Sequence, residues 1–142
     1  MRKLSLALAA ATVAAFTIPA AAQEKLKACW VYVGPVGDFG YSYQHDQGRL
    51  DVEKELGDKV ETTYLENVPE GTDADRSFER LAREGCKIIF GTSFGFMDSM
   101  VKVAAKFPDV KFEHATGYKK ADNRAIYNAR FYEGRYILGQ IA

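Results

Sequence analysis

Apolar and polar positions follow two different periods along this chain, and these predict alternating strands and helices from residue 27 onward. Five short runs rich in β-branched, aromatic and aliphatic residues predict strands at 27–33, 59–66, 87–93, 110–117 and 125–131. Between them, apolar residues recur at helical spacing and predict helices at 41–57, 72–85 and 97–107, and a further helical pattern begins at 132. This alternation is typical of an α/β domain with a parallel sheet.

The helical patterns also predict which sides face the core. In the first helix, Val52 and Leu56 lie one turn apart, and the charged run "DVEKELGDK" indicates a solvated face. The second helix opens with Thr72 and Asp75, which fit the S/T-x-x-D/E capping pattern. Its predicted core side consists of Phe78, Leu81 and Ala82.

The order of the elements restricts the topology. Right-handed crossovers leave few arrangements for a small parallel sheet, and the commonest has strand order 2-1-3-4-5 with helices on both faces. In such a sheet, ligands bind beyond the carboxyl ends of the strands, where the strand order reverses. The loops after the first, third and fourth predicted strands therefore form the expected binding edge.

The N-terminus has the three parts of a cleaved secretory signal. Arg2 and Lys3 precede an apolar run from Leu4 to Ile18, and Ala20–Ala22 provide an A-x-A cleavage site. A transmembrane helix needs about 20 apolar residues, so this run is short for a membrane anchor. We therefore expect residues 1–22 to be a signal peptide, and residues 23–142 to be an exported, periplasmic domain that does not itself span the membrane.

Charge and candidate chemistry exclude several classes of function. The chain has 19 basic and 19 acidic residues; without Arg2 and Lys3 the balance is 17 to 19, which gives no electrostatic footprint for nucleic acid. His45 and His114 lack the neighbours of a metal site, and no nucleophile–base set stands out. The glycine-rich "GPVGDFG" matches neither phosphate-loop pattern. We expect no cofactor, no metal and no enzymatic activity.

The three loops of the predicted binding edge are rich in aromatic and small polar residues. The candidate ligand-binding residues are Asp38, Phe39, Tyr41, Ser42, Ser93, Phe94, Phe96, Thr116 and Gly117, with Thr92 and Tyr118 beside them. Aromatic faces stack on flat rings, a carboxylate accepts from ring N–H or amine groups, and glycines permit close approach of the backbone. This composition favours a planar solute.

Two of these residues have a structural alternative. Asp38 could instead cap the first helix. Of Phe94 and Phe96, which are separated by one glycine, we expect one ring to point inward and the other into the crevice.

Three segments carry a family resemblance that covers essentially all of residues 27–142. "VYVGPVGDFGYSYQHDQGR", "FGTSFGFMDSMVKVAAKFPDVKFEHATGY" and "NARFYEGRYILGQIA" resemble the basic membrane protein family of ABC-importer substrate-binding proteins. The resemblance implies a type I periplasmic-binding-protein fold with two α/β lobes joined by crossing segments. It also implies a purine base or nucleoside clamped between the lobes and an ABC-importer permease as partner. This chain would supply the first lobe.

The resemblance also assigns roles to single positions. Asp38 falls on the family's loop aspartate, Tyr41 falls where an aromatic ring stacks on the base, and Ser42 falls where many members have asparagine. The family's usual "DG" after the fourth strand is here Thr116–Gly117, which removes a carboxylate and weakens the case for ribose contacts.

The two cysteines of the chain, Cys29 and Cys86, lie near the amino ends of neighbouring predicted strands, opposite the binding edge. An exported protein meets an oxidising compartment, where an even cysteine count favours pairing. The alternative is two buried thiols whose side chains point to opposite faces of the sheet.

Three functions are consistent with the sequence. The leading one is the extracytoplasmic solute-binding component of an ABC importer. The others are the ligand-binding lobe of a sensor or receptor and a secreted flavodoxin-like enzyme, which the fold alone does not exclude.

Overall fold

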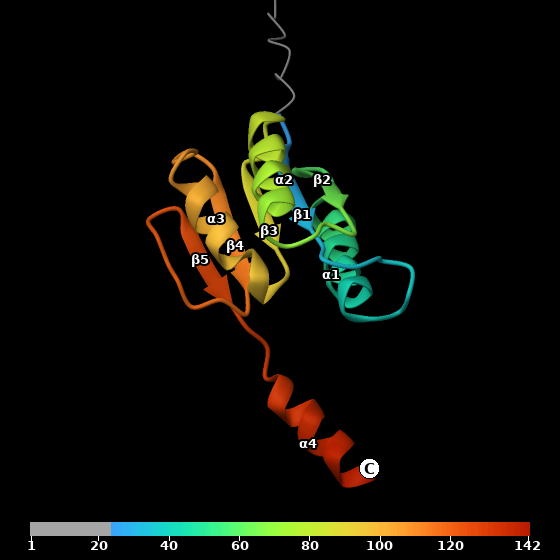
Figure 1. The fold of residues 1–142 in the computed structure, drawn as a ribbon. Coiled ribbons are helices and arrows are strands. Elements are labelled where there is room, and N and C mark those ends of the chain that lie inside the picture. The colour runs from blue at the N-terminus through green and yellow to red at the C-terminus, as the bar shows by residue number, and fades with distance from the viewer. Residues whose placement is uncertain (1–23) are drawn as a thin grey trace, which may run out of the picture.

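The computed structural model describes residues 24–142, so the predicted signal peptide at 1–22 lies outside the described residues. Strands and helices alternate along the chain as the sequence predicts (Figure 1). The strands are β1 (Leu26–Val31), β2 (Val60–Leu65), β3 (Ile88–Gly91), β4 (Lys111–Ala115) and β5 (Arg124–Tyr127). The helices are α1 (Tyr41–Leu56), α2 (Thr72–Arg83), α3 (Met97–Ala104) and α4 (Phe131–Ile141), and the short 3₁₀ helix η1 (Phe94–Phe96) leads into α3.

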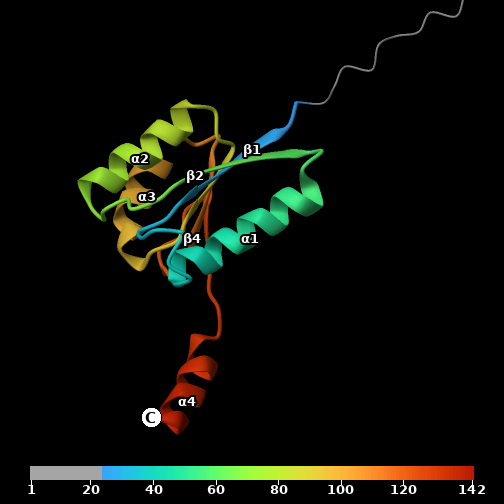
Figure 2. The ribbon, with the colours of Figure 1, turned by 90° about the vertical axis from the view of Figure 1, so that its right-hand side faces the viewer.

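All five strands are parallel and lie in the order β2-β1-β3-β4-β5, which confirms the predicted topology. Helix α1 covers one face of the sheet, whereas α2 and α3 cover the other (Figure 2). Since the strands are parallel, the chain segments that follow β1, β3 and β4 all emerge at the same edge.

The main apolar core lies between the sheet and the pair α2–α3. Phe78 and Leu81 of α2 are buried there, which confirms the predicted core side of that helix. Phe112 of β4 and Met100 of α3 complete the centre of this core. At Gly91 a β-carbon would overlap the sulfur of Met100, so a glycine at the end of β3 lets α3 approach the sheet closely.

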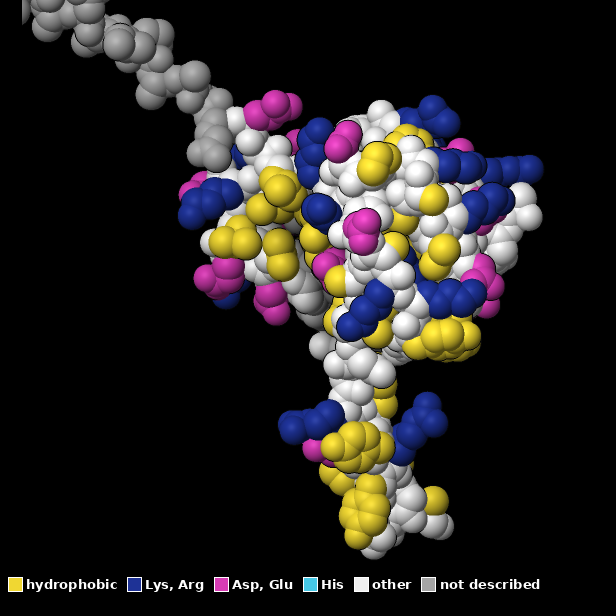
Figure 3. All heavy atoms as spheres, turned by 90° about the vertical axis from the view of Figure 1, so that its left-hand side faces the viewer, with side chains coloured by type: hydrophobic (Ala, Val, Ile, Leu, Met, Phe, Trp, Pro, Cys, Tyr) yellow, Lys and Arg dark blue, Asp and Glu magenta, His cyan; other side chains and the backbone are white. Residues whose placement is uncertain are grey.

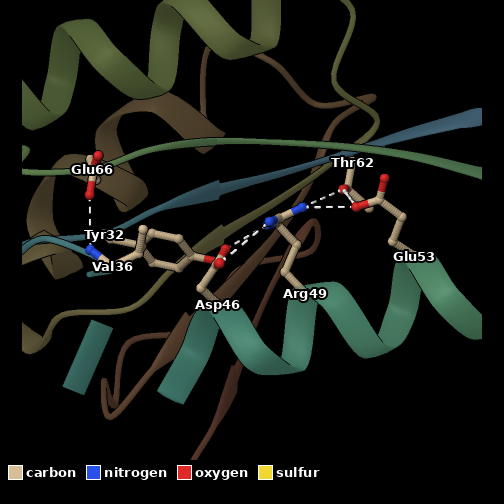
Figure 4. A network of polar contacts seen from close by, with 7 residues as sticks. All are labelled: Tyr32, Val36, Asp46, Arg49, Glu53, Thr62 and Glu66. Atoms are coloured by element: carbon tan, nitrogen blue, oxygen red, sulfur yellow. Dashed lines mark hydrogen bonds and ion pairs between the residues drawn. The ribbon is translucent and has the colours of Figure 1, made fainter. Parts of the chain in front are cut away.

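Helix α1 packs on the sheet through a polar network, unlike α2 (Figure 4). Arg49 forms a buried ion pair with Asp46 at 2.6 Å and donates to Thr62 of β2 at 2.8 Å. The hydroxyl of Tyr32 donates to Asp46 at 3.1 Å. Burial, and after it the carboxylate of Asp46, raises the pKa of the Tyr32 phenol, which therefore stays protonated as the donor.

The predicted apolar side of α1 is therefore only partly right. Val52 is half-buried, but Leu56 is exposed, and the buried residues of the helix are Ser42, Asp46 and Arg49. The arginine and the aspartate are buried as a hydrogen-bonded pair, which the hydrophobic periodicity of the sequence does not register.

The predicted capping box at Thr72 is wrong. Helix α2 begins at Thr72 itself, and the N-cap is Gly71, whose φ of 85° reverses the chain one residue earlier. No side chain caps the helix; the carboxylate of Asp75 instead accepts a hydrogen bond from Lys102 of α3. A glycine, which adopts a positive φ without strain, therefore occupies the N-cap position that the sequence pattern assigned to Thr72.

Cys29 of β1 and Cys86, which precedes β3, form a disulfide bond, with their α-carbons 6.0 Å apart. Both residues are completely buried on the α2–α3 side of the sheet. The two cysteine side chains therefore lie on the same face of the sheet, and Cys86 precedes the start of β3.

Helix α4 projects away from the packed body (Figures 1 and 3). Its apolar side chains are exposed, including Tyr136, Leu138 and Ile141. The packed body thus ends with β5 at Tyr127, and α4 buries none of its residues against it.

Candidate functional site

The candidate site lies at the carboxyl edge of the sheet, where the loops after β1, β3 and β4 emerge. Among residues 24–142 three non-glycine residues have positive φ, and two of them occur here, Phe39 with φ 58° and Thr116 with φ 67°. A left-handed conformation strains a residue that has a β-carbon by about 1–2 kcal/mol, and such strain clusters at ligand sites. The backbone of this edge is therefore held in an unusual shape.

The loop after β1 presents an aromatic ring and a carboxylate to solvent. Asp38 is exposed and accepts a hydrogen bond from the backbone N–H of Gly40 at 2.8 Å. Because Gly40 is the N-cap of α1 and no side chain caps that helix, Asp38 fixes the turn before the helix and does not cap it. Phe39 is 80% exposed, and its ring lies 4.9 Å from the ring of Tyr43. Within the described residues, only Oδ1 of Asp38 accepts a hydrogen bond, and Oδ2 has no donor there.

The first turn of α1 presents Tyr41 at the same edge. Its ring meets the imidazole of His45 edge-on at 4.6 Å. His45 in turn lines a small, mostly apolar pocket of about 90 Å³ together with Thr116 and Tyr127. Burial lowers the pKa of His45, so its imidazole is neutral near pH 7. Burial also raises the pKa of Tyr127.

His45 and Tyr127 were missed as site residues by the sequence reasoning. His45 follows Tyr41 by four positions, a spacing that places both on one side of a helix. From this spacing, the sequence could have identified Tyr41 and His45 as neighbours at the site. Tyr127 lies at the end of a strand whose predicted boundary, at 131, was four residues too late.

Ser42 is buried and faces the backbone, not the crevice. Its hydroxyl oxygen accepts a hydrogen bond from the N–H of Gly34 at 3.2 Å. The residue therefore ties the start of α1 to the loop after β1.

The loop after β3 separates its two phenylalanines as the sequence predicts. Phe96 is completely buried, and its ring lies edge-on against Phe78 of α2 at 5.5 Å. Phe94 is 55% exposed. Phe96 thus belongs to the core and offers no ring face to a solute, whereas Phe94 is available.

Ser93 is held from the side by the loop after β2. Its hydroxyl donates to a carboxylate oxygen of Glu70 at 2.6 Å. A β-carbon at Gly95 would overlap the same carboxylate, so the backbone of this loop lies directly against Glu70. Ser93 is therefore an anchor for the loop that carries Phe94. Thr92 is also buried, and its hydroxyl donates to the carbonyl of Val31.

The loop after β4 rests on a buried histidine. The hydroxyl of Thr116 donates to the carbonyl of Ala115 at 2.6 Å, so its side chain is engaged locally. A β-carbon at Gly117 would overlap the imidazole of His114, which makes glycine necessary there. Tyr118 is exposed, and its ring lies 6.3 Å from that of Phe94.

The structure arranges the exposed aromatic residues of this edge as three separate pairs. These are Phe94 with Tyr118, Phe39 with Tyr43, and Tyr41 with His45. None of the ring contacts of residues 24–142 joins one pair to another. Each pair presents at least one exposed aromatic ring, and Asp38 lies in the same loop as Phe39. This arrangement is suited to noncovalent binding of a flat solute.

The described part of the chain holds no group of three His, Cys, Asp or Glu side chains that would bind a metal ion. Within the same residues, every helix is too short or too polar to cross a membrane.

Comparisons with known proteins identify the family of the chain. Residues 25–142 match the protein family described as ABC transporter substrate-binding protein PnrA-like. Over 134 residues the chain is 66% identical to a purine-binding protein of Brucella abortus, covering 93% of this chain and 38% of that protein. It is 45% identical over 117 residues to a putative ABC transporter glucose-binding protein of Haloferax volcanii, covering 82% of this chain and 29% of that one.

The fold also matches solved structures of distant sequence. An ABC transporter solute-binding protein of Aeropyrum pernix superimposes with a TM-score of 0.68 at 21% identity, over 80% of this chain and 31% of that one. The chain spans well under half the length of the curated relatives that it matches. Proteins of the matched family bind solutes and are not enzymes. The chain belongs to the family of PnrA-like ABC transporter substrate-binding proteins.

Proposed function

We propose that this protein binds a purine base or nucleoside outside the cytoplasm and delivers it to the permease of an ABC importer. The observation that carries the proposal is the set of exposed rings at the carboxyl edge, with Tyr41 and Phe39 beside the carboxylate of Asp38. Aromatic faces stack on a purine, and the uncommitted carboxylate oxygen accepts from its N–H or amine groups. The name of the Brucella relative supports the same solute class.

The structure favours a free base over a nucleoside. Thr116, at the position where a carboxylate would contact a ribose, spends its hydroxyl on the carbonyl of Ala115. A ribose would then lack an acidic partner in this loop. The relative named a glucose-binding protein makes a sugar the competing solute class.

The binding mechanism that we propose requires a second lobe, which forms the other wall of the solute crevice. The described residues provide one α/β body, and α4 extends from it with apolar side chains that have no partner. In our proposal residues 23–142 contain the first of two lobes, α4 packs against the second, and closure of the lobes shuts water out of the crevice. Residues 1–22 would be the cleaved export signal.

Substitution of Tyr41 by alanine is expected to weaken purine binding by about 1–3 kcal/mol, because one stacking face is lost. The measurement is calorimetry on the full-length protein with adenine, hypoxanthine and their nucleosides, with glucose for comparison. A matched control is Leu56→Ala, since Leu56 and Tyr41 are both 43% exposed on α1 but at opposite ends of the helix. Binding of glucose without binding of any purine would overturn the proposed solute class.

The isolated fragment 23–142 is expected to bind purine weakly or not at all. It supplies only one wall of the crevice, so half of the stacking and all of the closure are missing. Calorimetry with adenine on the fragment and on the full-length protein measures the difference. Micromolar or tighter binding by the fragment would contradict the two-lobe mechanism.

A further inference from the structure

His114 is buried next to Ser93 and Gly117, the residues that adjoin the exposed rings of Phe94 and Tyr118. It belongs to β4, and its two ring nitrogens have different partners. Nε2 is 2.7 Å from the carbonyl oxygen of Ser93, in the loop after β3. Nδ1 is 2.7 Å from Nη2 of Arg124, in β5. The histidine therefore links two neighbouring elements on either side of its own strand.

The partners define the protonation state of the imidazole. A carbonyl oxygen only accepts and a guanidinium only donates, so Nε2 carries the proton and Nδ1 is the acceptor. Burial lowers the pKa of His114, the carbonyl of Ser93 raises it, and the guanidinium of Arg124 lowers it. A second proton on Nδ1 would face the guanidinium directly, so the neutral form is the one that fits.

Arg124 continues the link to the loop after β4. Its Nη1 donates to the carbonyl oxygen of Lys119, and its side chain is buried. Lys119 is also tied from outside, because its ammonium pairs with Asp98 of α3 at 2.5 Å. His114 and Arg124 together thus connect the carbonyl of Ser93 to the carbonyl of Lys119.

These two carbonyls flank the exposed rings. Phe94 follows Ser93 in the chain, and Tyr118 precedes Lys119, with the ring centroids of the two aromatics 6.3 Å apart. Gly117, next to Tyr118, rests against the imidazole itself. The buried pair therefore fixes both loops at positions adjacent to the rings.

We propose that His114, acting with Arg124, is a positioning residue that sets the spacing of Phe94 and Tyr118 for the solute. This inference rests on the proposed function, in which the two rings contact a flat solute. A histidine with a merely structural role would stabilise the whole body. A positioning role instead predicts a local effect, confined to the two loops and transmitted to the solute through Phe94.

Two variants separate the two hydrogen bonds. In His114→Asn, the side-chain oxygen lies near the position of Nδ1 and keeps the bond from Arg124, but the amide is too short to reach Ser93. In His114→Gln, the amide N–H takes the position of Nε2 and keeps the bond to Ser93, but the amide oxygen lies on the side away from Nδ1, so Arg124 loses its acceptor. Amide hydrogen exchange on the ligand-free full-length protein measures the effect at residues 93–96 and 117–119, with α2 as the internal reference.

The expected result is asymmetric. His114→Asn should raise exchange by about tenfold at 93–96, the ratio expected for loss of one buried hydrogen bond, and leave 117–119 and α2 unchanged. His114→Gln should keep exchange near the wild-type rate at 93–96 and raise it at 117–119, because Arg124 loses its acceptor. A uniform rise that includes α2, or equal behaviour of the two variants, would overturn the positioning role.

A binding measurement tests whether the effect of His114 on solute binding depends on Phe94. With adenine as the probe, His114→Asn should weaken binding by about tenfold in the wild-type background and have no effect in a Phe94→Ala background. An equal loss in both backgrounds would show that His114 does not act through Phe94. If the wild-type protein fails to bind adenine, the proposed solute is wrong, and the exchange measurement still decides whether His114 positions the loops.

Discussion

Removal of the disulfide by the double substitution Cys29→Ala and Cys86→Ala is expected to lower the free energy of unfolding by about 4 kcal/mol. The bond joins residues 57 positions apart, so it closes a large loop in the unfolded chain and restricts its conformations. Urea denaturation of the oxidised protein and of the variant measures the difference. Both positions are buried, so alanine places no polar group in the core.

A reductant provides the matched control for this prediction. Addition of reductant should destabilise the wild-type protein by a similar amount and leave the alanine variant unchanged. A thiol count on denatured, unreduced protein should find no free thiol. Two free thiols per chain would show that the bond does not form.

The substitution Asp46→Ala is expected to destabilise the protein by about 3 kcal/mol. It leaves the guanidinium of Arg49 in a buried position without its closest partner, and it removes the acceptor of the Tyr32 hydroxyl. The effect should lie at the lower end of the range for broken buried pairs, because Arg49 keeps Glu53 at 3.0 Å and Thr62 at 2.8 Å.

The chain offers a control with the same chemistry and spacing. Asp73 and Arg76 of α2 form an i,i+3 pair at 3.4 Å, but their side chains are 57% and 77% exposed, compared with 9% for both partners of the Asp46–Arg49 pair. Asp73→Ala should destabilise by less than about 1 kcal/mol. Similar effects of the two substitutions in urea denaturation would show that the buried pair contributes no more than a surface pair.

Most of the fold was predictable because its central strands carry consecutive apolar residues, and β1 buries four residues in a row. Continuous apolar runs such as that around Ile89 identify such strands, and the alternation with helices restricts the sheet to one common order. The apolar side of α2, with Phe78 and Leu81, follows from periodicity for the same reason.

The packing of α1 was not predictable from periodicity. Asp46 and Arg49 are charged residues that a hydrophobic pattern places on a solvated face, yet they are buried here as a bonded pair. Their burial depends on Thr62 and Tyr32, which come from other elements. Only the three-dimensional structure brings these partners together.

The candidate site, like the fold, was predictable from the sequence only in part. Sequence reasoning located the three loops, and it anticipated that one ring of the Phe94–Phe96 pair would be buried. It did not anticipate that Ser42 and Ser93 would use their hydroxyls on Gly34 and Glu70. A short polar side chain in a loop can hydrogen-bond to the backbone, to a neighbouring side chain or to a ligand. Which partner it takes depends on distances that the sequence composition does not give.

The disulfide also determines how the protein responds to its redox surroundings. The cross-link joins Cys29, the fourth of the six residues of β1, to Cys86, which lies two residues before β3. Reduction would remove the covalent tie between these two elements and lower the folding stability. In a compartment that contains both thiols and proteases, the reduced chain is selected against because it unfolds and is degraded. Formation of the bond would therefore separate chains that persist from chains that are degraded.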